Sequence, residues 1–122
     1  MVPAWVIVAI LNDGLGQQQQ EKTMIIVLGS VTVREDALEQ AITLSHSHVT
    51  RSRNEPGCIS HAVHIDSENS NRLVFVEHWQ DMGSLEKHFQ VPESGEFIQA
   101  MAELAVVAPE LKMYQADEIT RH

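Results

Sequence analysis

His88 is the side chain in this sequence best placed to accept a proton. It lies three residues after Leu85 and next to Phe89, so it borders the apolar stripe of a predicted helix. An unperturbed imidazole titrates near pH ~6.5, which suits general acid–base chemistry at neutral pH. The alternative is a histidine at the edge of the core that is hydrogen-bonded and takes no part in chemistry.

Glu77 and Trp79 project from the same face of a predicted strand, because side chains alternate along a strand. Trp79 could form an aromatic wall against a ring-shaped substrate, or it could be an ordinary core residue. Glu77 is a carboxylate in an otherwise apolar strand. It could orient a histidine or a substrate hydroxyl, but pairing with an arginine such as Arg72 is the interpretation that we favour.

Three further residues are candidates for binding a substrate. His64 shares a strand face with Ser60 and Ala62 and could point into a cavity, although an exposed histidine is the favoured interpretation. Phe97 and Met101 are four residues apart on the last predicted helix. We expect both to line a pocket, and this role is compatible with membership of the core.

Seven histidines invite a metal site, but their spacing along the chain argues against one. His46 and His48 are two residues apart on a predicted helix and do not face one another. His61 and His64 are three residues apart in a predicted strand and lie on opposite faces. No HExxH motif or His–Cys cluster is present. We therefore expect no metal, while histidines from different elements could still meet in the fold.

The composition is that of one acidic globular domain. With 122 residues and a net charge of −9, the chain has room for one domain and repels polyanions, so we expect no nucleic-acid partner. Cys58 is the only cysteine, which excludes an internal disulfide and favours a reducing, cytoplasmic location.

The first 23 residues differ from the rest. Residues 2–11 are apolar but too few to span a bilayer, which takes about 20 residues, so we expect no membrane association. The first basic residue is Lys22, whereas a signal peptide usually has an early Lys or Arg. We expect a loosely ordered extension over 1–23, with an export signal as the alternative, followed by one domain over 24–119.

The order of predicted elements is typical of an α+β domain. The periodicities predict a strand over 24–33, a helix over 35–53, strands over 58–66 and 72–79, a short helix capped by Asp81, a helix over 96–107 and a strand over 111–119. This order is the split βαβ arrangement of the ferredoxin-like fold, an antiparallel four-stranded sheet with helices on one face. Because little of the sheet is polar on either face, a second copy of the chain is the expected cover, giving a homodimer.

Three segments together carry a family resemblance: Glu-Pro-Gly-Cys at 55–58, Arg-Leu-Val-Phe-Val-Glu-His-Trp at 72–79 and Leu-Glu-Lys-His-Phe at 85–89. In this register they resemble the antibiotic biosynthesis monooxygenase (ABM) domain family, which includes small quinol monooxygenases. The resemblance covers residues 24 to about 119. It implies a dimeric α+β barrel with a pocket in each subunit between sheet and helices. It also implies oxidation of electron-rich aromatic or quinol-type molecules by O₂, with no metal or flavin.

Oxygenation without a cofactor needs a base, because O₂ accepts an electron more readily from a phenolate or enolate than from the neutral molecule. The predicted function is therefore a monooxygenase acting on a quinol or polyphenol, with His88 as base and Trp79, Glu77, His64, Phe97 and Met101 around the substrate. Two alternatives stay open. One is an isomerase of a small phosphorylated ketone with the same fold, and the other is a dimeric module that binds a small molecule without turnover.

Overall fold

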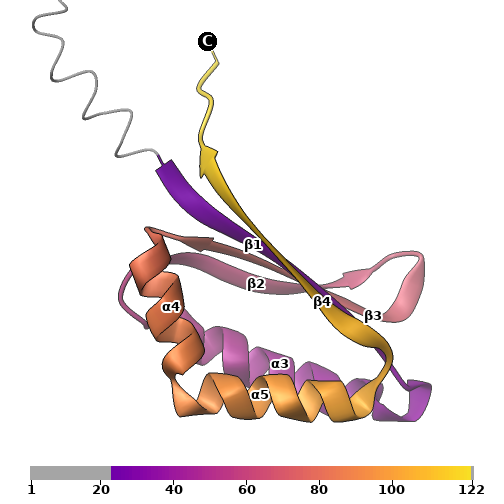
Figure 1. The fold of residues 1–122 in the computed structure, drawn as a ribbon. Helices are drawn as coiled ribbons and strands as arrows, with labels where there is room; N and C mark the ends of the chain where they lie inside the picture. The colour runs from indigo at the N-terminus through magenta and orange to yellow at the C-terminus, as the bar shows by residue number, and fades with distance from the viewer. Residues whose placement is uncertain (1–22, 122) are drawn as a thin grey trace, which may run out of the picture.

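Strands and helices follow one another in the predicted order (Figure 1). The computed structural model describes residues 23–121. Its elements are β1 (Thr23–Val33), the 3₁₀ turn η2 (Glu35–Ala37), α3 (Leu38–Ser52), β2 (Cys58–Asp66), β3 (Asn69–Trp79), α4 (Met82–Gln90), α5 (Pro92–Leu104) and β4 (Ala105–Asp117). The extension expected at 1–23 lies outside the described residues, apart from Thr23.

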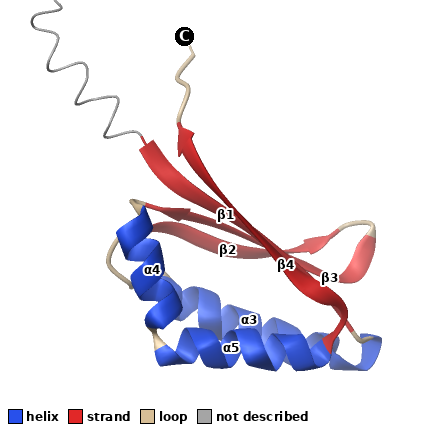
Figure 2. Ribbon diagram, viewed as in Figure 1, coloured by secondary structure: helices blue, strands red, loops and turns tan. Residues whose placement is uncertain are grey.

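The four strands form one antiparallel sheet in the order β2-β3-β1-β4. The three helices all lie on one face of this sheet (Figure 2). In β1, alternate residues from Ile25 to Val33 are buried, as expected when one face of a strand packs against helices. The structure therefore has the predicted α+β, ferredoxin-like split βαβ fold.

Two helices present buried polar side chains to the sheet. In α3, Ala41, Ser45 and His48 are buried at helical spacing. Helix α4 begins after Asp81, whose carboxylate accepts a hydrogen bond from the Ser84 backbone N–H at 2.8 Å, so the predicted N-cap is confirmed. Its buried residues are Leu85 and His88, and this spacing turns His88 inward.

The last third of the chain differs from the prediction in its boundaries. The segment 91–95, predicted as a loop, is mostly the first turn of α5, which begins at Pro92. Proline is tolerated there because the first N–H groups of a helix have no intrahelical partner. The predicted helix over 96–107 ends at Leu104, and Pro109 lies within β4. Because β4 is an edge strand, proline removes no ladder bond from a central strand.

The core consists of two apolar clusters. The larger includes Val31, Leu73, Phe75 and Met101, with Phe97 packed against it. The smaller cluster is Ile25, Val27, Trp79 and Leu85, with Cys58 and Phe89 packed against it. In residues 23–121, no helix has the length and apolar character needed to cross a membrane.

Candidate active site

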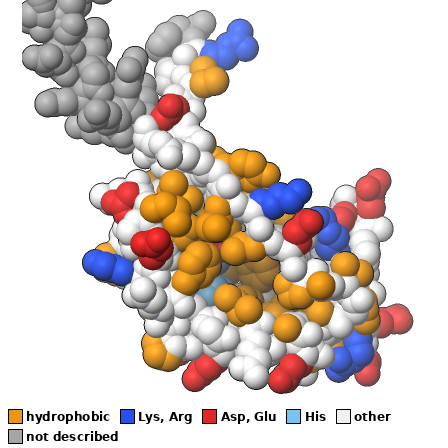
Figure 3. Space-filling model, in the orientation of Figure 1, with side chains coloured by type: hydrophobic (Ala, Val, Ile, Leu, Met, Phe, Trp, Pro, Cys, Tyr) orange, Lys and Arg blue, Asp and Glu red, His pale blue; other side chains and the backbone are white. Residues whose placement is uncertain are grey.

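A cavity of about 300 Å³ lies between the sheet and the helices, and its lining is mostly apolar. Figure 3 shows it as a hollow rimmed by hydrophobic side chains, with histidine at its base. The polar side chains of the lining are those of Ser30, His48, Glu77, His88 and Glu110. Such a lining suits a small, mostly apolar ligand, because few polar groups have to be matched.

His88 is buried, with only 3% of its surface exposed, and one of its ring nitrogens is fixed by a carboxylate. The Nδ1 atom lies 2.7 Å from Oε1 of Glu55, in the turn between α3 and β2. With the carboxylate as acceptor, Nδ1 carries the hydrogen of the neutral imidazole, and Nε2 keeps its lone pair. This pairing gives His88 the tautomer that a general base needs.

Arg51 connects the carboxylate of Glu55 to a second histidine. Its Nη1 atom lies 3.5 Å from Oε2 of Glu55, one turn further along the chain, and its Nη2 donates to Nδ1 of His48 at 2.8 Å. Nη2 also lies 3.5 Å from the hydroxyl of Ser94, which is buried at the start of α5. These contacts hold α3, the turn after it and α5 around the histidines.

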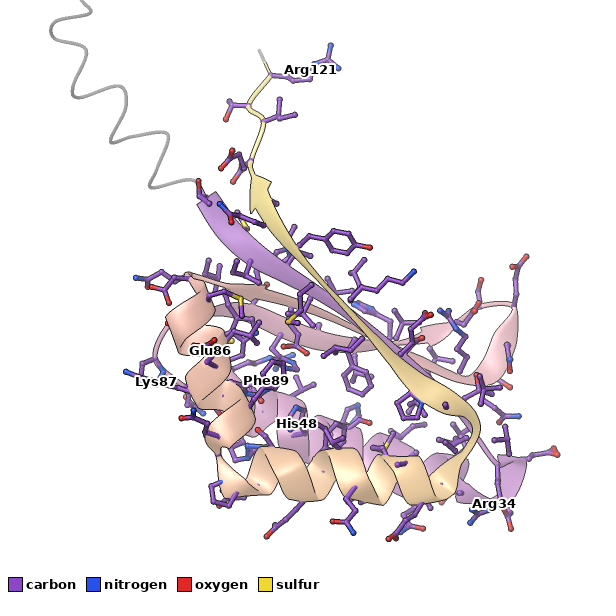
Figure 4. The ribbon with its side chains drawn as sticks, in the orientation of Figure 1. Arg34, His48, Glu86, Lys87, Phe89 and Arg121 are labelled. Carbon is purple, nitrogen blue, oxygen red and sulfur yellow. The ribbon has the colours of Figure 1, made fainter. Side chains whose placement is uncertain are left out.

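His48 is buried and neutral at physiological pH. Burial, together with the nearby His61, His88 and Arg51, lowers its pKa from 6.5 to about 3. Its ring stacks on Phe97 with 4.0 Å between centroids and an angle of 5°. In Figure 4, His48 projects from α3 into the space between helices and sheet, while Lys87 points away from α4.

Glu77 is buried, and it lies beside a histidine, which was the alternative interpretation, and not beside the favoured arginine. The indole N–H of Trp79 donates to Oε1 of Glu77 at 2.8 Å, and Nε2 of His61 lies 3.3 Å from the same oxygen. Burial acts to raise the pKa of Glu77, but His61 and the indole N–H outweigh it and lower the pKa. The favoured pairing with Arg72 is wrong, because Arg72 binds Asp66 at 3.1 Å.

Three imidazoles from three elements meet at the base of the cavity. The ring centroids of His48, His61 and His88 are separated by 5.3 Å, 5.3 Å and 5.6 Å. One nitrogen from each ring lies within 4.8 Å of the other two. The spacing argument compared histidines only within one element, so it missed this cluster. Alternation along β2 was the available signal for His61: because it puts His61 and His64 on opposite faces, an outward His64 implies an inward His61.

The structure brings most of the predicted site residues together. His88, Glu77, Phe97 and Met101 line the cavity. Trp79 is fully buried behind it, with its ring 4.7 Å from that of His88. His64 is exposed, as the favoured interpretation had it, and it lines a separate depression, so its alternative place as a substrate-binding residue in this cavity is wrong.

This fold and site define a small α+β domain with a mostly apolar cavity beside buried histidines. The family model for antibiotic biosynthesis monooxygenases matches residues 24–100, which is more than half of the chain. The chain therefore belongs to the antibiotic biosynthesis monooxygenase family.

The chain is also similar to individual proteins of known sequence or structure. An uncharacterised protein of Synechocystis sp., sll1783, is 36% identical over 94 residues, which cover 77% of this chain and 64% of that protein. A conserved protein from Methanosarcina mazei has a TM-score of 0.74 and 26% identity, covering 78% of this chain and 94% of its own. A candidate antibiotic biosynthesis monooxygenase from Deinococcus radiodurans has a TM-score of 0.76 at 22% identity, covering 80% and 97%. At 22% identity, the similarity to the Deinococcus radiodurans protein shows a shared fold and nothing about function.

Proposed function

We propose that this protein is a cofactor-independent monooxygenase that oxidises a quinol or polyphenol-type molecule with O₂. The observation that carries the proposal is the placement of His88. Its Nδ1 is held by Glu55 at 2.7 Å, and the ring lines an apolar cavity of about 300 Å³. Membership of the antibiotic biosynthesis monooxygenase family supports the same class of reaction.

The proposed reaction begins with proton transfer. Nε2 of His88 takes a proton from a phenolic or enolic O–H of the bound molecule, and Glu55 stabilises the imidazolium that forms. The resulting anion donates an electron to O₂, the two radicals combine at the carbon that becomes oxidised, and the peroxide anion takes back the proton held by His88. Where that carbon is a CH₂ group between two aromatic rings, as in an anthrone, loss of water from the peroxide balances the reaction, with CH₂ and O₂ becoming C=O and H₂O.

The apolar walls contribute to the same step. Phe97, Met101 and Phe75 would hold the ring, and the scarcity of water around it strengthens each electrostatic interaction in the cavity. Trp79 would not touch the substrate but would hold two residues that line the cavity, since its ring packs on His88 and its indole N–H donates to Glu77. Among the described residues that line the cavity, none is a lysine or arginine, which disfavours a phosphorylated ketone as substrate.

We expect the active form to be a homodimer. Strand β4 is exposed along most of its length, including the large apolar side chains of Leu111, Met113 and Tyr114. Leu111 also lines the cavity. A second copy packed on this strand would cover the apolar surface and narrow the opening.

Oxygen uptake by chelator-treated protein tests the proposal. Reduced quinols and anthrone-type phenols would be supplied to the wild type and to His88→Gln, with autoxidation subtracted. Because a positioned general base contributes about 10²–10⁴-fold, the variant should lose at least about 100-fold of the rate. His64→Gln, on the other face of β2, is the matched control and should keep full activity. Uptake by no substrate, or equal uptake by His88→Gln, would contradict the proposal.

A further inference from the structure

We propose that His48, His61 and His88 together form a binding site for a divalent transition-metal ion such as Zn²⁺. The three imidazoles come from α3, β2 and α4, and all are buried, with exposed fractions of 6%, 1% and 3%. One nitrogen of each lies within 4.8 Å of the other two. Three converging histidines are the ligand set of catalytic zinc sites that leave a fourth position open.

The ring centroids are spaced as in a tetrahedral site, whereas the nitrogens, within 4.8 Å of one another, are further apart than the roughly 3.4 Å between two ligands on one ion. With metal–nitrogen bonds of about 2.0–2.1 Å, three imidazole centres around one ion lie about 5.2 Å apart. The observed separations are 5.3 Å, 5.3 Å and 5.6 Å. From a separation of 4.8 Å, each nitrogen has to move less than about 1 Å to reach bonding distance.

His61 is the residue that points most clearly to a ligand. Neither of its ring nitrogens has a hydrogen-bond partner within residues 23–121, and both are buried. Nε2 lies 3.3 Å from Oε1 of Glu77 without hydrogen-bond geometry, and the ring meets that of His48 edge-on and that of His88 at a tilt. Buried polar atoms are normally paired, so an ion bound by one nitrogen would satisfy an otherwise costly group.

Carboxylates lie behind two of the proposed ligands. Glu55 holds Nδ1 of His88 at 2.7 Å, which leaves Nε2 for the ion. Glu77 lies 3.3 Å from Nε2 of His61 and is not hydrogen-bonded to it. A carboxylate that is hydrogen-bonded to a metal-binding histidine orients it and makes it more basic, which is the role expected of Glu55. Neutral nitrogen ligands favour Zn²⁺, Co²⁺, Ni²⁺ or Cu²⁺ over Mg²⁺ and Ca²⁺.

One group opposes the ion. Arg51 donates to Nδ1 of His48 at 2.8 Å, which places the hydrogen of the neutral ring on Nε2. For Nε2 to bind a metal, that hydrogen must move to Nδ1 and the guanidinium must turn away. Replacing Arg51 should therefore strengthen metal binding.

A depression on the helix side offers a cation a route to His48. Its lining includes His48, Arg51 and the two carboxylates Glu93 and Glu96.

Titration of the chelator-treated full chain with Co²⁺ tests the site, because cobalt bound by four ligands absorbs visible light strongly. We expect one Co²⁺ per chain with a four-coordinate spectrum, displaced by Zn²⁺. His61→Gln and His48→Gln should weaken binding by more than about 100-fold, beyond the 10–100-fold typical of a residue that only supports a ligand. His64→Gln and His46→Gln are exposed controls and should bind as the wild type does.

Two outcomes of the Co²⁺ titration would overturn the site: weak, six-coordinate binding of Co²⁺ by the wild type, and Co²⁺ binding by His61→Gln that equals that of the wild type. If the glutamine variants melt early, Arg51→Gln gives a second test, since its affinity should rise and an unchanged or lower affinity contradicts the proposal.

The site also has a consequence that rests on the proposed function. Nε2 of His88 cannot bind a metal and accept a proton at the same time, so Zn²⁺ should inhibit oxygen uptake. The two proposals fail separately. Oxygen uptake without Co²⁺ binding overturns only the metal site, and Co²⁺ binding without oxygen uptake overturns only the oxygenase.

Discussion

Replacing Glu55 by glutamine tests whether its carboxylate prepares His88 for proton transfer. The hydrogen bond from Nδ1 of His88 is 2.7 Å long, and Glu55 is not among the cavity-lining residues. A hydrogen bond to a charged group is worth about 1.5–3 kcal/mol, and about 1.4 kcal/mol corresponds to a factor of ten. We therefore expect Glu55→Gln to lower kcat by about 10- to 150-fold, with little change in KM.

The direction of the effect follows from hydrogen-bond chemistry. The new amide can turn its NH₂ group toward Nδ1, which would place the hydrogen of the neutral ring on Nε2 and remove the base. Glu55→Asp keeps the carboxylate and should recover part of the rate.

Oxygen-electrode kinetics at several substrate concentrations separate kcat from KM. Glu86→Gln is the matched control, because Glu86 is exposed on the same helix as His88. Full activity in Glu55→Gln, or a change in KM alone, would refute the reasoning that Glu55 acts through His88.

Three further predictions concern folding, pH and assembly. Gly57 has a φ of 85°, and an added Cβ would lie 2.0 Å from Oγ of Ser84. Gly57→Ala should lower the free energy of unfolding by about 1–2 kcal/mol through backbone strain alone. Gly95→Ala is the control and should be neutral or stabilising, because the added Cβ meets open space inside α5; thermal melts compare the two variants. Because the pKa of His48 is about 3 in the folded chain and near 6.5 when unfolded, the unfolded chain binds the extra proton and stability falls as pH drops from about 6.5 toward 3. Urea titrations should show this loss in the wild type and a smaller one in His48→Phe, which keeps a ring against Phe97; equal losses would contradict a neutral buried His48. Light scattering should give about twice the chain mass of 13.7 kDa, and a monomer mass at micromolar protein would contradict the dimer.

Much of the fold could be predicted because its signals are local. The strand expected over 58–66 is β2 with the same bounds, since a glycine turn precedes it and a polar hairpin follows. The boundary errors lie around two prolines: Pro92 was placed in a loop before the helix predicted over 96–107, and Pro109 was taken to end that helix. Pro92 instead starts α5 and Pro109 lies within the edge strand β4, two positions where proline removes no needed hydrogen bond.

The site was only half predictable, because its pairs are distant in sequence. Helical spacing was enough to turn His88 inward, and alternation placed Glu77 and Trp79 on one face. The partner of His88, however, is Glu55, 33 residues away, in a turn whose geometry depends on how α3 packs against the sheet. For the same reason the contacts of His48 and His61 with His88 could not be predicted, since residue spacing within one helix or strand does not indicate which other helix or strand it meets.

Ionisation of a bound phenol tests the central claim most directly. An anthrone-type phenol would be added to chelator-treated protein without oxygen, in a buffer about two pH units below the pKa of the free phenol. The account predicts the absorption of the anion in the wild type and in His64→Gln, and that of the neutral phenol in His88→Gln. Neutral phenol bound to the wild type, or the same anion bound to His88→Gln, would contradict a base at His88.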